Sequence, residues 1–385
     1  MGFPCSFSGI FRTIRGVFSF LQDMSAFTSF PLRVRKVTHE TPDTVSITLD
    51  VPSDLADTFA YKAGQYLTLE VPGKKGPIRR AYSLCRAPFE QEWTITIKEQ
   101  ARGQASPWLN KEVREGDTLQ VFPPLGRFFI EPDADRKRGY FFITAGSGIT
   151  PVIAMIKDLL ENEPQSFCYL LYGSRDEESI IFRSELDRLV RHYAGQLQVV
   201  HTLSQPDGKS SGLRGMFKKK PASTWDGFRG RINEERILSF LNESNCPFKE
   251  RHAYLCGPAS LMDIADKALK ASGLPPERIH REHFDSDPLP ATSGGSSAEL
   301  TATLDGQDLH VHVKSGQTLL EAMMGAGHQV PFSCSSGACA SCMAHLDEGE
   351  VIMDFAPALD RSEIDDGYIL TCQAKAKSSS LKITY

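Results

Sequence analysis

The sequence contains no run of eighteen or more apolar residues, which argues against a membrane-spanning helix. It has no internal repeats, so a solenoid or a propeller is not expected. It also has no pair of Glu-x-x-His motifs on helical segments and no haem motif, so a substrate-oxidising centre of either kind is not expected. The chain has 385 residues, 41 % of them hydrophobic and 24 % charged, which suits a soluble protein of two or three domains.

Basic charge is scarce at the C-terminal end. The formal net charge is −5, yet residues 298–385 alone contain twelve acidic and five basic residues. The rest of the chain is therefore close to neutral. Nucleic-acid binding requires basic patches, so that class of function is excluded. An acidic module instead suits transient docking to a positively charged surface of a partner protein.

The nine cysteines do not form a disulfide pattern, because their number is odd and most are scattered. Four of them, Cys334, Cys339, Cys342 and Cys372, lie close together in the last module. This usage predicts a reducing, cytoplasmic location and one metal or cluster site.

The first 26 residues differ from the rest. Apolar residues recur there at three- and four-residue spacing around Arg12 and Arg15, which predicts a short basic amphipathic helix that could lie on a membrane surface. The opening MGFPCS also fits a lipidation pattern, with Cys5 as a second acylation site. The alternative is a plain extension upstream of Met24, and peripheral membrane contact is the less favoured of the two interpretations.

The remaining pattern predicts three domains and a linker. Residues 27–135 contain six short alternating segments, which predict a six-stranded antiparallel β-barrel. Residues 136–284 alternate apolar strands with amphipathic helices, which predicts a doubly wound α/β domain. The stretch 205–224 within them is too polar for regular structure and reads as a loop. Residues 285–297 are a Pro/Ser/Gly linker, and 298–385 form a separate α+β module.

The cysteine spacing of the last module is specific. Cys334-x4-Cys339-x2-Cys342, followed by Cys372, places three thiolates on one loop and the fourth on a separate element, as a [2Fe–2S] cluster requires. The loop between them consists of small residues, so its backbone N–H groups can approach the sulfurs. Four thiolates also bind zinc, but zinc modules usually pair their cysteines as two C-x2-C knuckles.

Two segments of the barrel fit a flavin nucleotide. In Arg80-Ala81-Tyr82-Ser83, strand alternation puts a guanidinium and an aromatic ring on one face, where they suit a phosphate and a flat ring system. Farther along, Gly103 and Ser106 belong to a glycine turn that opens a short helix, which can offer N–H groups to a pyrophosphate. Each motif alone is also compatible with ordinary packing or capping.

The α/β domain carries a dinucleotide pattern. The segment 141–151, FFITAGSGITP, reads as strand, glycine turn and helix, with Thr150 as the N-cap and Pro151 as the first helical residue. Gly146 and Gly148 would let the backbone approach phosphates. Ser174 and Arg175 end the next strand, where a hydroxyl and a guanidinium suit a 2′-phosphate and favour NADPH, with NADH as the alternative. Cys256, before Gly257-Pro258, also ends a strand.

Residues 298–385 resemble the plant-type ferredoxins, and this resemblance implies a β-grasp domain with Cys334, Cys339, Cys342 and Cys372 as the ligands of [2Fe–2S]. The ordered motifs of residues 31–284 resemble the ferredoxin–NADP reductase superfamily. These motifs are G-Q-Y (64–66), R-x-Y-S, G-x-x-S, P-x-G-x-F (124–128), G-S-G-I-T-P, G-S-R and C-G-P. The whole order is similar to the reductase component of the phenylacetyl-CoA epoxidase, or ring-1,2-monooxygenase, family.

The resemblance also implies residue roles. Arg80, Ala81, Tyr82, Ser83, Gly103 and Ser106 would bind FAD, with Ser83 near flavin N5, although FMN remains the alternative. Gly146, Gly148, Thr150, Ser174 and Arg175 would bind NADPH. Cys256 would lie by the nicotinamide C4 and assist hydride positioning, and Glu282 and Phe284 match the acidic and aromatic positions that close this domain. Ser83, Cys256 and Glu282 are thus the expected catalytic residues.

The function expected from these features is an NAD(P)H-dependent iron–sulfur flavoprotein reductase that passes electrons from NADPH through FAD and [2Fe–2S] to a separate oxygenase. Reductases of a fatty-acid desaturase or of a hybrid-cluster protein are alternatives within the same class. A redox sensor without turnover and a membrane-docked adaptor are alternatives outside it.

Overall fold

The computed structural model describes residues 28–74, 76–207, 225–284, 294–353, 356–359 and 361–385. The predictions made for residues 1–26, and for most of the 205–224 loop and of the linker, therefore lie outside the described residues. Among the helices of these ranges, none has the length and apolar character needed to cross a bilayer.

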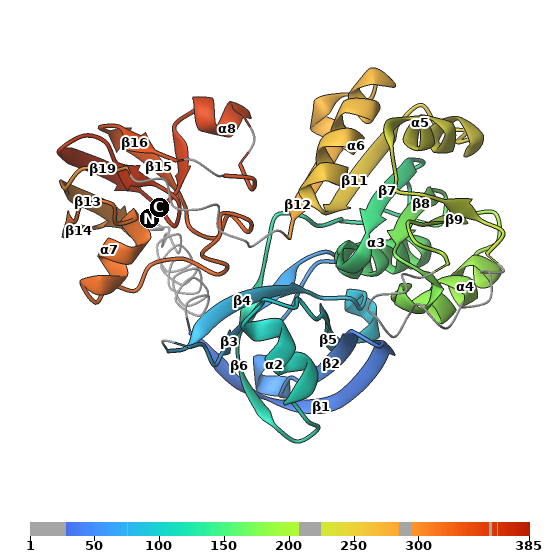
Figure 1. Cartoon of the computed structure of the whole chain (residues 1–385), viewed down its shortest axis with the longest axis horizontal. Coiled ribbons are helices and arrows are strands. Elements are labelled where there is room, and N and C mark those ends of the chain that lie inside the picture. Colours follow the sequence, from blue (N-terminus) through green and yellow to red (C-terminus); the bar gives the residue numbers. More distant parts are fainter. Residues whose placement is uncertain (1–27, 75, 208–224, 285–293, 354–355, 360) are drawn as a thin grey trace, which may run out of the picture.

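The first part is the expected antiparallel barrel (Figure 1). Its strands are β1 (Phe30–Thr41), β2 (Thr44–Asp50), β3 (Tyr66–Val71), β4 (Ile78–Ser83), β5 (Trp93–Lys98) and β6 (Thr118–Leu125). They are ordered β4-β3-β6-β1-β2-β5, and a bridge between Leu84 and Ile95 joins the two edge strands. The helix α2 (Ala105–Lys111) contributes Ala105 and Leu109 to the barrel core. The barrel therefore has few free edges, as its alternating sequence predicts.

The second part is a parallel sheet with helices on both faces. Its elements are β7 (Gly139–Ala145), α3 (Ile149–Asn162), β8 (Phe167–Ser174), α4 (Arg183–His192), β9 (Leu197–Leu203), β10 (Phe228–Arg229), α5 (Glu234–Glu243), β11 (Arg251–Gly257), α6 (Ala259–Ala271) and β12 (Ile279–His283). The strand order is β10-β9-β8-β7-β11-β12. The short β10 and β12 were not predicted from the sequence.

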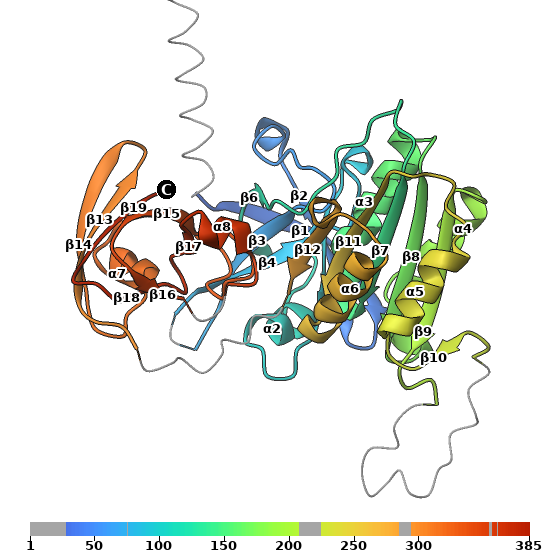
Figure 2. The ribbon, with the colours of Figure 1, turned by 90° about the horizontal axis from the view of Figure 1, so that it is seen from above.

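Strand β7 is buried on both faces, which explains its unbroken apolar sequence. Tyr140 and Phe142 pack with α3 and α4, whereas Phe141 and Ile143 pack with α5 and α6. Figure 2 shows α5 and α6 together on one side of the sheet.

The helix α3 also joins the second part to the barrel. Barrel-side residues, among them Ala63, Cys85 and Phe128, belong to the same hydrophobic cluster as the fully buried Val152 and Met155 of α3. Burial of apolar surface contributes about 25 cal/mol per Å², so a shared core of this kind opposes separation of the two parts. Their relative orientation is thereby restricted.

The third part contains the cysteine loop. Its elements are β13 (Ala298–Leu304), β14 (Gln307–Val313), α7 (Leu319–Gly325), β15 (Met343–Glu348), β16 (Val351–Ile352), α8 (Arg361–Asp365), β17 (Tyr368–Leu370), β18 (Lys375–Ala376) and β19 (Ser380–Thr384). The main sheet has the order β14-β13-β19-β15-β17, and β13 and β19 run parallel. Thr318 caps α7 through a reciprocal bond with Glu321. A mixed sheet accompanied by the helices α7 and α8 agrees with the α+β module predicted for these residues.

The third part lies against the barrel on the side of β3 and β4 (Figures 1 and 2). Thr68 and Ser333 share a hydrogen bond of 2.6 Å between their hydroxyls. The guanidinium carbon of Arg79 lies 4.0 Å from the ring centre of Phe122 and 4.2 Å from that of Phe332, so this cation bridges the two parts.

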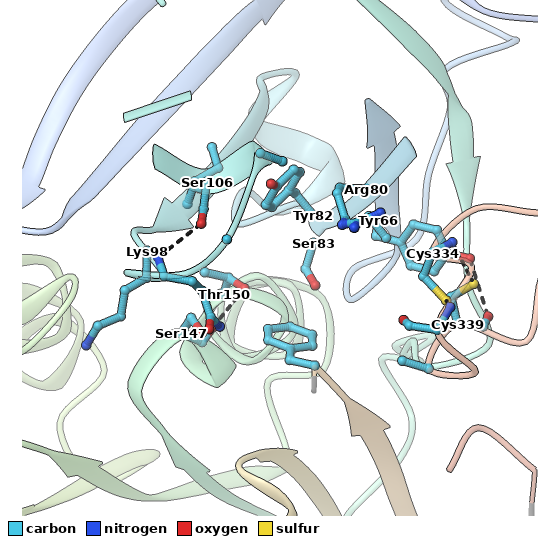
Figure 3. Close-up of a pocket in the computed structure, with 18 of the residues that line it drawn as sticks. Tyr66, Arg80, Tyr82, Ser83, Lys98, Ser106, Ser147, Thr150, Cys334 and Cys339 are labelled. Carbon is cyan, nitrogen blue, oxygen red and sulfur yellow. Dashed lines mark hydrogen bonds between the residues drawn. The ribbon is translucent and has the colours of Figure 1, made fainter. Parts of the chain in front are cut away.

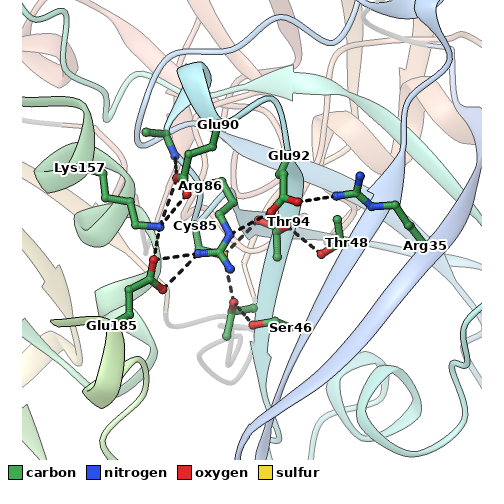
Figure 4. Close-up of polar contacts among 12 residues, drawn as sticks. Arg35, Ser46, Thr48, Cys85, Arg86, Glu90, Glu92, Thr94, Lys157 and Glu185 are labelled. Carbon is green, nitrogen blue, oxygen red and sulfur yellow. Dashed lines mark hydrogen bonds and ion pairs between the residues drawn. The ribbon is translucent and has the colours of Figure 1, made fainter. Parts of the chain in front are cut away.

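A buried ionic network holds the barrel to the α/β part (Figure 4). The side chain of Lys157, on α3, is only 4 % exposed and donates to both oxygens of Glu90 at 3.2 Å. It also contacts Glu185 of α4, which in turn accepts from Arg86 at 3.0 and 3.1 Å. Burial raises the pKa of Glu185, but Lys157 and Arg86 more than offset this, so the pKa is lowered and the carboxylate stays ionised. Each charge in this network therefore depends on a partner from the other part.

Lys157→Met should destabilise the protein because it leaves two carboxylates facing one another without their shared cation. Breaking a buried ion pair by removing one partner costs about 3 kcal/mol or more. The measurement is the urea midpoint of unfolding for the wild type and the variant. Lys111→Met is the matched control, because its ion pair with Glu99 is exposed and should contribute about 0.5 kcal/mol. Equal losses in the two variants would contradict this account.

Candidate functional site

A cavity of about 600 Å³ opens where the three parts of the chain meet (Figure 3). Its lining from the barrel includes Tyr66, Arg80, Ala81, Tyr82, Ser83, Lys98, Gly103 and Ser106. The α/β part contributes Ser147, Thr150, Glu282, His283 and Phe284, and the third part contributes Cys334, Ser336, Ala338 and Cys339. Motifs that are far apart in the sequence therefore line one cavity.

The R-x-Y-S segment forms β4, at the edge of the barrel sheet. Arg80, Ala81, Tyr82 and Ser83 all line the cavity, and β4 pairs with β3 in the register Tyr66–Ser83 and Thr68–Ala81. The Arg80 guanidinium donates to the carbonyl of Arg79 at 2.7 Å and keeps further N–H groups for a ligand. Burial keeps the pKa of Tyr82 above its ordinary value, so its phenol is neutral. This wall offers a cation, a flat ring and a hydroxyl.

The glycine turn at residues 100–106 forms a further part of the cavity wall. The Gly103 N–H donates to the Gln100 carbonyl at 2.8 Å, and the Gln100 N–H donates to the Ser106 hydroxyl at 3.0 Å. A Cβ on Gly103 would lie 2.9 Å from that hydroxyl oxygen, so the tight turn requires glycine here. Ser106 thus stabilises the turn as an acceptor, and its O–H remains able to donate into the cavity.

The turn between β7 and α3 corrects one prediction. Thr150 is not the N-cap of the helix, because α3 already begins at Ile149 after Gly148. The Thr150 hydroxyl instead donates to the Ser147 carbonyl at 3.0 Å. A Cβ on Gly148 would lie 2.2 Å from the carbonyl oxygen of Cys256, so glycine is required where this turn touches β11. Close packing against β11, which the sequence does not reveal, therefore sets the start of the helix.

Several predicted residues do not line the cavity. Gly146 and Gly148 flank Ser147 without lining the cavity themselves, and Cys256 is fully buried at the end of β11. Ser174 is buried, and its hydroxyl has no hydrogen-bond partner within the described residues. Arg175 pairs with Asp43 at 3.6 Å and with Asp176 at 3.3 Å.

Ser83 and Glu282 meet across the boundary between the barrel and the α/β part. The Ser83 hydroxyl donates to the Glu282 carboxyl at 3.5 Å, and Glu282 lies beside Cys256 in the pairing of β12 with β11. Glu282 is partly exposed, and the surface it faces is the cavity. Burial raises the pKa of Glu282 to about 8 despite the opposing hydrogen bond from Ser83. At neutral pH this carboxyl is therefore protonated and can donate a proton or a hydrogen bond.

The four cysteines of the third part fall into two pairs. The Cys334 N–H points to the Cys339 sulfur at 3.4 Å, and the hydrogen bond between these two thiols lowers the pKa of Cys334 to about 6. A hydrogen bond from Cys342 likewise lowers the pKa of Cys372. Within the described ranges, no three His, Cys, Asp or Glu side chains are grouped to hold a single metal ion. Two thiol pairs suit a centre with two metal ions better than a single zinc ion.

Backbone geometry lets this loop present N–H groups to sulfur. Ser335 and Ala340 adopt φ of +56°, and Gly337 adopts +79°, so the chain turns tightly around the thiols. The Ser336 N–H donates to the Cys334 sulfur at 3.3 Å, and the Gln373 amide donates to the Cys372 sulfur at 3.6 Å. Donors aimed at sulfur stabilise negative charge there. The donor set fits a cluster held by thiolates.

Lys98 and Tyr66 are among the residues of the cavity wall that were not predicted from the sequence as site residues. Lys98 is the last residue of β5, and its ammonium nitrogen lies 3.8 Å from the carboxylate of Asp43. Tyr66 ends the G-Q-Y motif, one of the ordered motifs of residues 31–284, for which no individual role was predicted. Its partner lies on the cysteine loop, so the contact could not be read from the motif alone.

Comparison with known families agrees with the three parts. Residues 31–130 match the family described as oxidoreductase FAD-binding domain, and residues 142–267 match the oxidoreductase NAD-binding domain. Residues 302–377 match the 2Fe-2S iron-sulfur cluster binding domain.

Two relatives match nearly the whole chain. One subunit of the 1,2-phenylacetyl-CoA epoxidase of Escherichia coli (strain K12) is 34 % identical over 363 residues, which cover 92 % of this chain and 97 % of that protein. The 3-ketosteroid-9-alpha-monooxygenase, ferredoxin reductase component, of Rhodococcus rhodochrous is 35 % identical over 367 residues, which cover 92 % and 96 %.

The fold is also that of a solved reductase. Phthalate dioxygenase reductase has a TM-score of 0.58 and 24 % identity, with 93 % of this chain and 98 % of that chain covered. An intact type IV self-sufficient cytochrome P450 monooxygenase has a TM-score of 0.64 and 24 % identity, with 92 % of this chain and 41 % of that chain covered. These structures share the three-part arrangement.

Glu282→Gln tests the raised pKa. Between the ordinary Glu pKa of 4.5 and about 8, the folded protein keeps a proton that the unfolded chain has lost. Stability from this group is therefore full below pH 4.5 and is lost as the pH rises through 8. As the pH rises from 6 to 9, the free energy of unfolding of the variant should increase relative to that of the wild type by about 1 kcal/mol or more, measured by urea unfolding. The exposed Glu277→Gln is the control, and a pH-independent difference for Glu282→Gln would refute the assignment.

Proposed function

Because this chain belongs to the family of NAD(P)H-dependent reductases that combine FAD-binding, NAD-binding and 2Fe-2S domains, we propose that it is the electron-donating component of a multicomponent monooxygenase. It takes electrons from a pyridine nucleotide and passes them through FAD and [2Fe–2S]. Its acceptor is a separate oxygenase, of which the phenylacetyl-CoA epoxidase type is the first candidate. The single cavity that all three parts line carries this proposal.

The proposed cluster ligands are Cys334, Cys339, Cys342 and Cys372. Their two thiol pairs and the N–H groups aimed at sulfur support this assignment. Cys334 and Cys339 line the cavity, so one side of the centre would face the flavin site directly. A centre so placed needs no further carrier between the two groups.

For the flavin we propose β4 and the glycine turn. Arg80 would bind phosphate, and Tyr82 would lie along the ring system beside Ala81. Ser83 would form a hydrogen bond near the reactive nitrogen, and Ser106 with Gly103 would meet the pyrophosphate. FAD, when bound, accepts a hydride and releases electrons singly. The hydride transfer requires that the nicotinamide reach the flavin from the α/β part.

The nicotinamide would enter beside the turn of Ser147 and Thr150. Gly146 and Gly148 let this turn approach phosphate, and Cys256 supports the turn from behind through its carbonyl. Phe284 closes the cavity on this side. Glu282, neutral at pH 7 and bonded to Ser83, can hold a proton next to the flavin site. These residues orient the reactants and exclude water.

The proposed domain boundaries are 27–135 for FAD binding, 136–284 for NAD(P)H binding, 285–297 for the linker and 298–385 for the ferredoxin domain. The family matches fall within these bounds, as do three of the four hydrophobic cores, and the fourth is the core that α3 shares with the barrel.

The first test is an anaerobic visible spectrum of the purified protein before and after one equivalent of NADPH. Flavin bands and a broad cluster shoulder should both be present, and both should bleach. The electrons can reach the cluster because its loop lines the flavin cavity. A colourless protein that binds zinc would overturn the proposal. Bleaching of the flavin alone would favour the sensor alternative.

Arg175→Glu tests nucleotide choice. Arg175 forms ion pairs with Asp43 and Asp176, and we expect it to leave these partners and bind the 2′-phosphate when NADPH is present. The variant then loses a charge-assisted contact that only NADPH makes. KM for NADPH should rise roughly tenfold or more, and KM for NADH should change little. Arg188→Glu, on the exposed face of α4, is the control. Equal effects on the two nucleotides would contradict the assignment.

A further inference from the structure

Tyr66 connects the barrel to the cysteine loop at the wall of the cavity (Figure 3). It stands at the first position of β3 and is only 3 % exposed. Its hydroxyl oxygen lies 2.5 Å from the hydroxyl of Ser341 and 3.4 Å from the carbonyl oxygen of Cys339. One phenol therefore contacts the short segment between two cysteines.

Glycines of two motifs make close backbone contacts next to Tyr66, and Gly126 contacts its ring directly. Gly126, with φ of +121°, lies so close that a Cβ would be 3.0 Å from the ring. Gly64, with φ of +109°, would place a Cβ 2.3 Å from the carbonyl oxygen of Phe128. Gln65 donates to the Gly126 carbonyl at 3.2 Å and ties the two turns together. The G-Q-Y and P-x-G-x-F motifs therefore meet at this side chain.

Strand pairing within the barrel sheet also fixes the position of Tyr66. It pairs with Ser83 of β4 and with Leu125 of β6 in the barrel sheet. Ser83 lines the cavity and bonds to Glu282. The Tyr66 residue therefore lies between the strand proposed to hold the flavin and the loop proposed to hold the cluster.

We propose that Tyr66 is a positioning residue, whose hydroxyl holds the Cys339–Cys342 segment against the cavity so that the cluster and the flavin keep one separation. This inference rests on the proposed function and assigns a role to a motif that the flavin and nucleotide sites leave unused. The two hydroxyls form one neutral hydrogen bond of 2.5 Å, which is partly buried because the Tyr66 side chain is almost fully enclosed.

Other contacts hold the same two parts together without reaching the cavity. Arg127 pairs with Glu363 and donates to the Ala358 carbonyl at 2.9 Å, with half of its side chain exposed. Neither Arg127 nor Glu363 lines the cavity. Substitutions can therefore distinguish two effects: attachment of the third part to the barrel by Arg127 and Glu363, and positioning of the Cys339–Cys342 segment by Tyr66.

The experiment uses the full-length holoprotein and the variants Tyr66→Phe, Ser341→Ala and Arg127→Met. Anaerobic stopped-flow mixing with NADPH follows bleaching of the flavin and of the cluster separately. In Tyr66→Phe and Ser341→Ala, flavin bleaching should keep its rate, and cluster bleaching should slow roughly fivefold, as the loss of one neutral hydrogen bond predicts. Arg127→Met should keep both rates within about twofold.

A second readout does not depend on turnover. The circular dichroism of the oxidised cluster should change in Tyr66→Phe, because the Cys339 carbonyl loses its partner, and should be unchanged in Arg127→Met. Wild-type cluster bleaching and dichroism in Tyr66→Phe would overturn the inference, as would equal slowing in Arg127→Met. Failure of the wild-type cluster to bleach at all would instead count against the proposed function.

Discussion

The contact between Ser83 and Glu282 requires that two domains keep a fixed relative orientation, because the residues belong to different domains and their oxygens lie 3.5 Å apart. A tilt of one domain against the other would separate them. Two features oppose such a tilt. The apolar face of α3 shares a core with the barrel, and Lys157 joins carboxylates from both sides in a site from which water is largely excluded. The contact between Ser83 and Glu282 is thus maintained by interactions away from the cavity.

The ferredoxin domain is held differently. Its contacts with the barrel include the hydroxyl pair of Thr68 and Ser333, the stacked cation of Arg79 and the exposed ion pair of Arg127. Contacts of these kinds each contribute little, so the position of the domain depends on several acting together. This arrangement brings the cysteine loop to the cavity wall.

Much of the fold could be predicted from the sequence. The barrel strands and the four long helices of the α/β domain follow from hydrophobic period, which depends only on which face of an element is buried. The cysteine loop was also predictable, because its spacing is a local requirement of the metal centre. By contrast, the start of α3 depends on Gly148 packing against the Cys256 carbonyl, and β12 was missed because its five residues carry no clear alternation.

The sequence by itself therefore determined the kinds of domain, their order and the residues proposed to bind each group. Those properties follow from periodicity and from spacing within short segments. Tertiary structure alone decided which of these residues share a cavity. It brought Cys339 and Glu282 to the flavin side, linked Tyr66 to Ser341 and directed Arg175 to Asp43. Such contacts join residues far apart in the chain, and their partners are set by how whole domains pack, which no local pattern records.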